Sequence, residues 1–246
     1  MNLRLLAQTD AAAATQPTGF LDIVFSGGLV GIAIIVALLG LSIAAVYLIF
    51  DQIMTLRRSE IAPDGLHDAV RQALLRGSVA EADAACRRQP SVLSYTLLFG
   101  LSEIDLGWQE VEKAVEDALA EQSARLMRKI EYLSLIGNIA PMVGLLGTVT
   151  GMIIAFQQVA TSAGAAGAGD LAEGIYQALV TTVGGLVVAI PSLGAFAIFR
   201  NRVDALIADV AHQTGHALSP IKRRNTARRA EKPSVVPTAT KPIDPR

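Results

Sequence analysis

A row of polar side chains lies inside an otherwise apolar stretch of the sequence. Glu173, Gln177 and Thr181 recur at intervals of four, which places them on one side of a helix, and Thr182 starts an adjoining row. Such groups are costly against lipid, so we expect this side to face protein or a water-filled cavity. The alternative is a solvated carboxylate at Glu173 and hydroxyls bonded to their own backbone.

Small residues are concentrated in two apolar stretches. Gly147 and Gly151 form a small-xxx-small pattern that allows helix backbones to approach closely, and Gly144 lies on the same stretch. Gly184 and Gly185 have the corresponding place in the stretch that carries the polar row. Helix packing alone would explain these glycines, but their density predicts faces that meet other helices rather than lipid.

Groups elsewhere give little reason to expect catalysis. His212 and His216 have the spacing of a metal pair, but apart from Asp209 no third ligand lies at helical spacing, so we interpret them as a solvated helix face. Cys86 adjoins two arginines that could lower its pKa, yet no base or resolving thiol is in view, which favours an inert thiol. Without a phosphate loop or a nucleophile motif, we expect neither an enzyme nor a bound cofactor or metal.

The composition is that of a membrane protein. Of the 246 residues, 52% are hydrophobic and only 17% are charged. Stretches without Asp, Glu, Lys or Arg run between Asp22 and Asp51, between Glu131 and Asp170, and between Glu173 and Arg200. Each is long enough for a helix to cross a bilayer, at about 1.5 Å rise per residue and about 30 Å of hydrocarbon. The sequence therefore predicts three transmembrane helices.

The distribution of positive charge predicts the topology. Every Lys and Arg except Arg4 lies between the first and second spans or after the third. By the positive-inside rule those two segments are cytoplasmic and the N-terminus is periplasmic, as a short tail rather than a signal peptide. We expect a periplasmic segment at 1–25, spans at 26–50, 132–159 and 171–199, a cytoplasmic helical domain at 51–131, a periplasmic loop at 160–170, a cytoplasmic helix at 200–218 and a disordered basic tail at 219–246.

The segment before the second span predicts a cytoplasmic helical domain. Gly77 with Ser78 separates two short helices, Pro63 suits a first helical turn, and Pro90 with Ser91 starts a further helix. A longer helix from about Gln109 is expected to run unbroken into the second span, because its apolar residues recur at helical spacing. That stripe consists of Val111, Val115, Ala118, Leu119, Gln122, Leu126 and Ile130. The fold class is thus an all-α membrane protein whose long helices continue from the membrane into the cytoplasm.

Two runs of sequence closely resemble a known family. The run APMVGLLGTVTGMIIAF at 140–156 and the run LAEGIYQALVTTVGGLVVAIP at 171–191 are similar to the core of the MotA/TolQ/ExbB proton channel family, above all to ExbB and TolQ. The resemblance implies that Thr148 and Thr182 are pore-lining threonines, and that Pro141 and Pro191 match the family's membrane prolines. Gln177 departs from ExbB and TolQ, which typically have a glutamate in this stretch.

The resemblance also implies an assembly. It predicts a homopentameric ring in the bacterial inner membrane, surrounding a dimer of single-span ExbD- or TolR-like partners whose aspartate carries H⁺. The ring would energise a TonB- or TolA-like protein, for outer-membrane transport or envelope maintenance, and no nucleic-acid partner is expected. A passive membrane scaffold without ion flux and a MotA-like stator subunit are the alternatives, although a stator usually has four spans.

Overall fold

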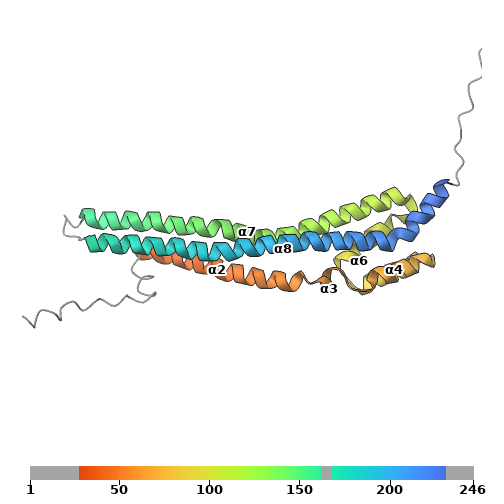
Figure 1. Ribbon diagram of the computed structural model, residues 1–246, viewed down its shortest axis with the longest axis horizontal. Helices are drawn as coiled ribbons and strands as arrows, with labels where there is room; N and C mark the ends of the chain where they lie inside the picture. Colours follow the sequence, from red (N-terminus) through yellow and green to blue (C-terminus); the bar gives the residue numbers. More distant parts are fainter. Residues whose placement is uncertain (1–27, 162–167, 231–246) are drawn as a thin grey trace, which may run out of the picture. The chain divides into compact units, whose positions relative to one another are not determined.

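Every element in the described part of the chain is a helix. In the computed structural model the described residues are 28–161 and 168–230 (Figure 1). Stretches of α2 (Gly28–Thr55), α7 (Trp108–Thr161) and α8 (Ala168–Ala230) are long and apolar enough to cross a membrane. The prediction of an all-α protein with three such helices is confirmed. The pentameric ring and the sidedness of the termini stay predictions.

The long helices extend beyond several predicted limits. α2 continues past residue 50, while α7 runs without interruption from Trp108 through Pro141, as expected. α8 does not end at residue 218 but crosses Pro220 and reaches Ala230. Leu218, Pro220 and Ile221 are buried, so packing holds this part of the helix in place despite the proline. The expected segments at 1–25, at 162–167 within the loop and at 231–246 lie outside the described residues.

The chain divides into two compact units, each formed by segments from distant parts of the sequence. Unit 1 contains the chain up to Asp51 together with Ile130–Ile198, and unit 2 contains Gln52–Lys129 together with the chain from Phe199. These divisions fall within one or two residues of the predicted span ends at 50, 131 and 199.

Unit 1 is a bundle of three helices with little interior. Its buried cluster joins Ile34 and Leu38 of α2 to Ala140 of α7 and Ala189 of α8. Large apolar side chains cover the outer face, and Val36, for example, is 61% exposed. An apolar exterior around a core of small residues is typical of helices that pack in lipid.

Unit 2 contains the shorter helices and the remaining parts of α7 and α8. The shorter elements are α3 (Arg58–Ile61), α4 (Leu66–Leu75), α5 (Val79–Arg88), α6 (Val92–Ser102) and the 3-10 helix η1 (Ile104–Leu106). Gly100 of α6 lies against Val115 of α7 and Leu218 of α8, so the three helices share one core. Val111, Ala118, Gln122, Leu126 and Ile130 are buried, and Val115 and Leu119 are half-buried, which confirms the amphipathic stripe.

Local signals explain the helix starts in unit 2. Ser91 caps α6 with a reciprocal capping box to Ser94, and Ser78 accepts a hydrogen bond from the Glu81 amide at the start of α5, so both predicted starts are confirmed. The prediction for Pro63 is wrong, because α4 begins only at Leu66. Gly65 before it has a φ of +82°, a left-handed conformation that separates the proline from the helix.

Candidate functional site

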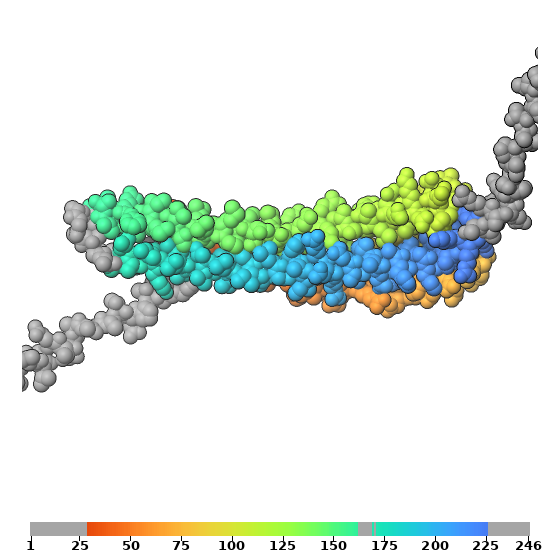
Figure 2. All heavy atoms as spheres, turned by 45° about the horizontal axis from the view of Figure 1, so that its top comes forward, coloured from red at the N-terminus to blue at the C-terminus, as the bar shows by residue number. Residues whose placement is uncertain are grey.

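A close contact between α7 and α8 lies inside unit 1. Both Thr181 and Thr182 of α8 have their hydroxyl oxygen near the Gly144 carbonyl oxygen of α7, at 3.3 Å and 3.2 Å. We call Gly144, Gly147, Thr181, Thr182 and Gly185 the glycine–threonine seam. Figure 2 shows the green atoms of α7 beside the teal atoms of α8.

Glycine is required at the seam because backbone atoms oppose it directly. A β-carbon at Gly185 would lie 2.6 Å from the Ala140 carbonyl oxygen, and one at Gly144 would lie 2.9 Å from the Thr181 carbonyl oxygen. A β-carbon at Gly147 would overlap the Thr181 hydroxyl. These distances are shorter than van der Waals contact, so each glycine allows an approach that any other residue would prevent.

The hydroxyl protons of the seam are already used. Each threonine has one hydroxyl proton. Thr182 donates across the helix pair to Gly144, whereas Thr181 donates mainly to the Ala178 carbonyl of its own helix, at 2.7 Å. Toward any further group, both hydroxyls therefore present their lone pairs and act as acceptors.

Thr148 does not belong to the seam. It is half-buried on α7 and donates to the Leu145 carbonyl oxygen at 2.8 Å, on its own helix. The structure thus brings Thr181 and Thr182 together and leaves Thr148 apart from them within this chain. Its expected role in lining a pore stays a prediction, as does that of Thr182.

An apolar groove lies beside α8, and part of the predicted polar row lines it. It has a volume of about 620 Å³ and lies between α2, α7 and α8 in unit 1, with Gln177 and Thr181 among its lining residues. Most of the other lining residues are aliphatic, including Ile35 and Leu39 of α2. Glu173 is exposed. The predicted polar row is therefore divided between the groove wall, the seam and the surface.

The two prolines and the remaining predicted packing residues differ in their surroundings. Pro141 and Pro191 lie within α7 and α8, where each lacks the N–H that would bond the carbonyl four residues earlier. A β-carbon at Gly151 would be 3.0 Å from the Ala178 β-carbon, a tight contact. At Gly184 the nearest atom is Leu38 Cδ1 at 3.6 Å, which leaves room for a methyl group.

Sequence reasoning missed one packing residue in this contact. A β-carbon at Gly174 would lie 2.5 Å from the Ala155 β-carbon of α7. Gly174 and Ala178 are separated by four positions, so the small-xxx-small pattern could have identified this pair. The close packing of α7 on α8 therefore extends beyond the seam toward Glu173.

The Cys86 thiol of unit 2 is buried, which makes it less acidic. Burial, with a smaller effect of the Asp83 carboxylate, raises the pKa of the Cys86 thiol to about 11. Arg87 cannot activate this thiol, because its guanidinium pairs with Asp83 at 2.7 Å. Cys86 is thus an unreactive thiol at neutral pH, in agreement with the interpretation of the sequence.

The apolar exteriors, the three long helices and the tight seam define a multi-span helical membrane protein. Residues 91–212, which contain α6, all of α7 and most of α8, match the MotA/TolQ/ExbB proton channel family. A putative biopolymer transport protein ExbB-like 3 of Synechocystis is 31% identical over 192 residues, which is 77% of this chain and 89% of the relative. The chain belongs to the MotA/TolQ/ExbB proton channel family.

Other relatives match over a smaller part of their length. A putative biopolymer transport protein ExbB homolog of Methanothermobacter thermautotrophicus is 30% identical over 63% of this chain and 54% of the relative. The Tol-Pal system protein TolQ of Pseudomonas aeruginosa is 35% identical over 42% of this chain and 44% of the relative. The chain therefore spans about half the length of these two curated relatives.

Proposed function

We propose that this chain is the ExbB- or TolQ-like subunit of a motor driven by the proton-motive force in a bacterial inner membrane. It forms a homopentameric ring around a dimer of ExbD- or TolR-like single-span partners. With them it energises a TonB- or TolA-like protein, for outer-membrane transport or envelope maintenance. Family membership and the names of relatives such as TolQ and ExbB1 support this proposal.

The observation that carries the proposal is the combination of a polar seam with the lack of an acid in the middle of the spans, since the one acid within the predicted spans, Glu173, lies at the start of the third. The stretches 26–50, 132–169 and 174–199 contain no Asp, Glu, His, Lys or Arg. A proton crossing this protein therefore needs a titratable carrier from another chain. A single-span partner with a membrane carboxylate supplies such a carrier, and H⁺ is the expected transported ion.

The ring is supported by the surfaces of unit 1. A bundle of three helices buries few large side chains and leaves a groove of about 620 Å³ along α2, α7 and α8. Additional helices, from copies of the chain and from the partner, would cover such faces. The N-terminus is proposed to be periplasmic, and Asp51 to Lys129 cytoplasmic, from the placement of Lys and Arg.

The bonding of the threonines suggests how the site treats a carboxyl group. Thr148 and Thr182 both donate their protons to backbone carbonyls, so they offer lone pairs to the interior of the ring. A protonated carboxyl donates to such a lone pair, whereas a carboxylate cannot. The site would favour the neutral form of the partner's acid, which is the form that crosses apolar surroundings at low cost.

The test begins with assembly and continues with flux. The chain is co-expressed with an ExbD- or TolR-like single-span protein, purified, and analysed for stoichiometry by native mass spectrometry. Proton uptake is then measured in vesicles that carry an imposed membrane potential and a pH-sensitive dye. Assembly with flux supports the motor, assembly without flux supports a passive scaffold, and a monomer that retains no partner contradicts the proposal.

Threonine substitutions test the site itself. Thr148→Val combined with Thr182→Val keeps the side-chain shape but removes both hydroxyls, so assembly should persist while proton uptake falls at least about tenfold, as for other positioned polar groups in a proton step. Thr161→Val is the control, because Thr161 is bonded to its own helix at Gln157 and lies at the end of α7. A double variant with wild-type flux would contradict the proposed role.

A further inference from the structure

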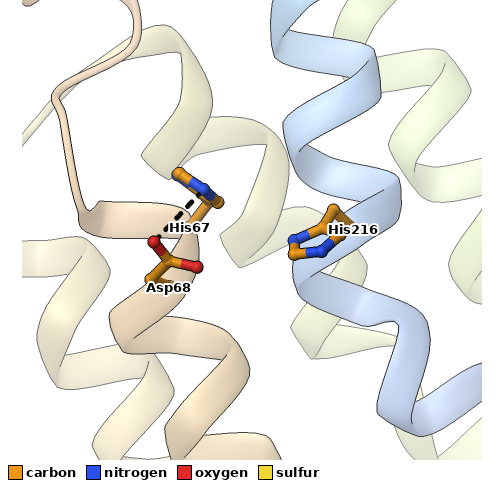
Figure 3. Close-up of side chains that lie close together, drawn as sticks. All are labelled: His67, Asp68 and His216. Atoms are coloured by element: carbon orange, nitrogen blue, oxygen red, sulfur yellow. Dashed lines mark ion pairs between the residues drawn. The ribbon is translucent and has the colours of Figure 1, made fainter.

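Two histidines and an aspartate lie together in unit 2, apart from the seam. His67 and Asp68 belong to α4, and α8 contributes His216. Each residue offers one potential ligand atom, and these atoms all lie within 4.8 Å of one another. Figure 3 shows the His216 ring turned toward His67 and Asp68. His67 Nε2 is 3.5 Å from Asp68 Oδ2, and the two imidazole centroids are 6.0 Å apart.

Two buried nitrogen atoms in and beside this cluster lack hydrogen-bond partners. His67 Nδ1 is buried and has no hydrogen-bond partner. Arg71 Nη1 lies 3.3 Å from His216 Nε2, while Nε of the same guanidinium is buried without a partner. A buried polar atom without a hydrogen-bond partner is unfavourable, so this arrangement carries a free-energy cost at His67 Nδ1 and Arg71 Nε.

We propose that His67, Asp68 and His216 bind a divalent transition-metal ion of the Zn²⁺ class. Imidazole nitrogens and a carboxylate oxygen are ligands that Zn²⁺ prefers, and three protein ligands leave a fourth position for water. In a tetrahedral site, ligand atoms about 2.0 Å from the ion are about 3.3 Å apart. Asp68 and His216 are exposed, so their side chains can rotate to close the remaining distance.

Arg71 competes with the ion for His216. A guanidinium that donates to His216 Nε2 occupies its lone pair, and its positive charge repels a cation beside it. The ion and Arg71 therefore occupy the site alternately. When Arg71 leaves it gives up one hydrogen bond, and its buried Nε becomes free to bond water. A bound ion would fasten α4 to α8 within unit 2.

The chain provides a matched control. It contains three histidines, and the third, His212, is exposed one turn before His216 on the same helix. Cys86 is buried and its pKa is raised to about 11, so it does not supply a thiolate to compete for the metal at neutral pH. Purification through a non-histidine tag, followed by chelator treatment, leaves the cluster as the principal candidate site.

Isothermal titration calorimetry with Zn²⁺ on the full-length protein in detergent tests the proposal. One Zn²⁺ per chain should bind the wild type and His212→Ala alike. Changes outside the ligand shell alone cost about 10–100-fold in metal affinity, so His67→Ala or His216→Ala should weaken binding at least about 100-fold. Arg71→Gln should tighten it.

Replacement by Co²⁺ gives a second readout. Its visible absorption intensifies in tetrahedral coordination, so the band should appear in the wild type and in His212→Ala but not in His216→Ala. Circular dichroism of each variant verifies that it has folded. Equal Zn²⁺ affinity in the wild type and His216→Ala, or no binding to the wild type or to folded Arg71→Gln, would overturn the proposal.

Discussion

The substitution Gly185→Ala tests the glycine–threonine seam directly. Its new methyl group would lie 2.6 Å from the Ala140 carbonyl oxygen, and the opposing atoms belong to the backbone, which cannot rotate away. Because ordinary contact begins at about 3.4 Å, α7 and α8 must separate by roughly 0.8 Å at this point. The contact of the Thr182 hydroxyl with the Gly144 carbonyl oxygen would lengthen from 3.2 Å to about 4.0 Å, which is no longer a hydrogen bond.

The size of the effect follows from three contributions to the free energy of unfolding. Overpacking costs about 1–3 kcal/mol. An interhelical hydrogen bond in a membrane protein contributes about 0.6 kcal/mol. Alanine recovers about 1 kcal/mol over glycine through its helix propensity. Gly185→Ala should therefore destabilise the protein by about 0.6–2.6 kcal/mol.

Gly184→Ala is the matched control. It changes the neighbouring glycine of the same helix, where a β-carbon would lie 3.6 Å from the nearest atom, Leu38 Cδ1. The helix propensity gained is the same, but the α7–α8 contact stays intact. This variant should be as stable as the wild type or up to about 1 kcal/mol more stable.

Thermal unfolding of both full-length variants, followed by far-ultraviolet circular dichroism in one detergent, provides the measurement. For a chain of this size about 1 kcal/mol corresponds to about 2–4 °C, so the Tm of Gly185→Ala should fall by about 1–10 °C while that of Gly184→Ala does not. Equal Tm values for the two variants would refute the seam geometry, because helix propensity cannot distinguish adjacent glycines.

Three further predictions concern other parts of the chain. Because its pKa is raised to about 11, the Cys86 thiol should be alkylated at about pH 8 at least tenfold more slowly in the folded protein than in denaturant. The alkylation rate of the folded protein should rise as the pH approaches 11. Equal rates in the folded and denatured protein would contradict the burial of this thiol. Arg202 Nε donates to the carbonyl oxygen of Leu56, just after the end of α2, at 3.0 Å. Arg202→Met should therefore lower the free energy of unfolding by about 1 kcal/mol, measured by thermal unfolding. Arg200→Met is the control, and an equal loss in both variants would exclude this bond. Gln177→Leu should impair proton uptake in the reconstituted complex while Gln177→Glu is tolerated and Glu173→Gln causes a partial loss; complete loss in Glu173→Gln with intact assembly would place the relay there instead.

Much of the fold follows from the sequence because the relevant signals are local or periodic. The stripe from Val111 to Ile130 has helical spacing, and its residues up to Leu126 pack into unit 2 as expected. Ser91 and Ser94 form the capping box that starts α6. The end of α8 was not predictable in this way, since Pro220 and a basic tail suggested an ending and only the packing of Leu218 and Ile221 shows that the helix continues.

The cluster of His67, Asp68 and His216 shows a second limit of local reasoning. The spacing of His212 and His216 suggested a metal pair on one helix, but the structure places His216 beside α4 and leaves His212 exposed. Contacts between distant segments depend on the helix packing of unit 2, and no spacing within one helix encodes them. Sequence reasoning therefore treated His216 as part of a solvated helix face, and its place beside His67 and Asp68 came only from the structure.

The glycine–threonine seam shows the same limit for the direction of a single hydrogen bond. The sequence places hydroxyl groups at Thr148 and Thr182, and a hydroxyl alone can donate or accept. Which it does depends on the nearest carbonyl, and for Thr182 that carbonyl belongs to Gly144 on another helix. Because this contact uses the hydroxyl proton, the side chain is left as an acceptor. In the proposed complex, a carboxyl group of the partner beside Thr182 would then be bound better with its proton than without it, so the glycine that allows α7 and α8 to approach would also determine which protonation state the threonine favours.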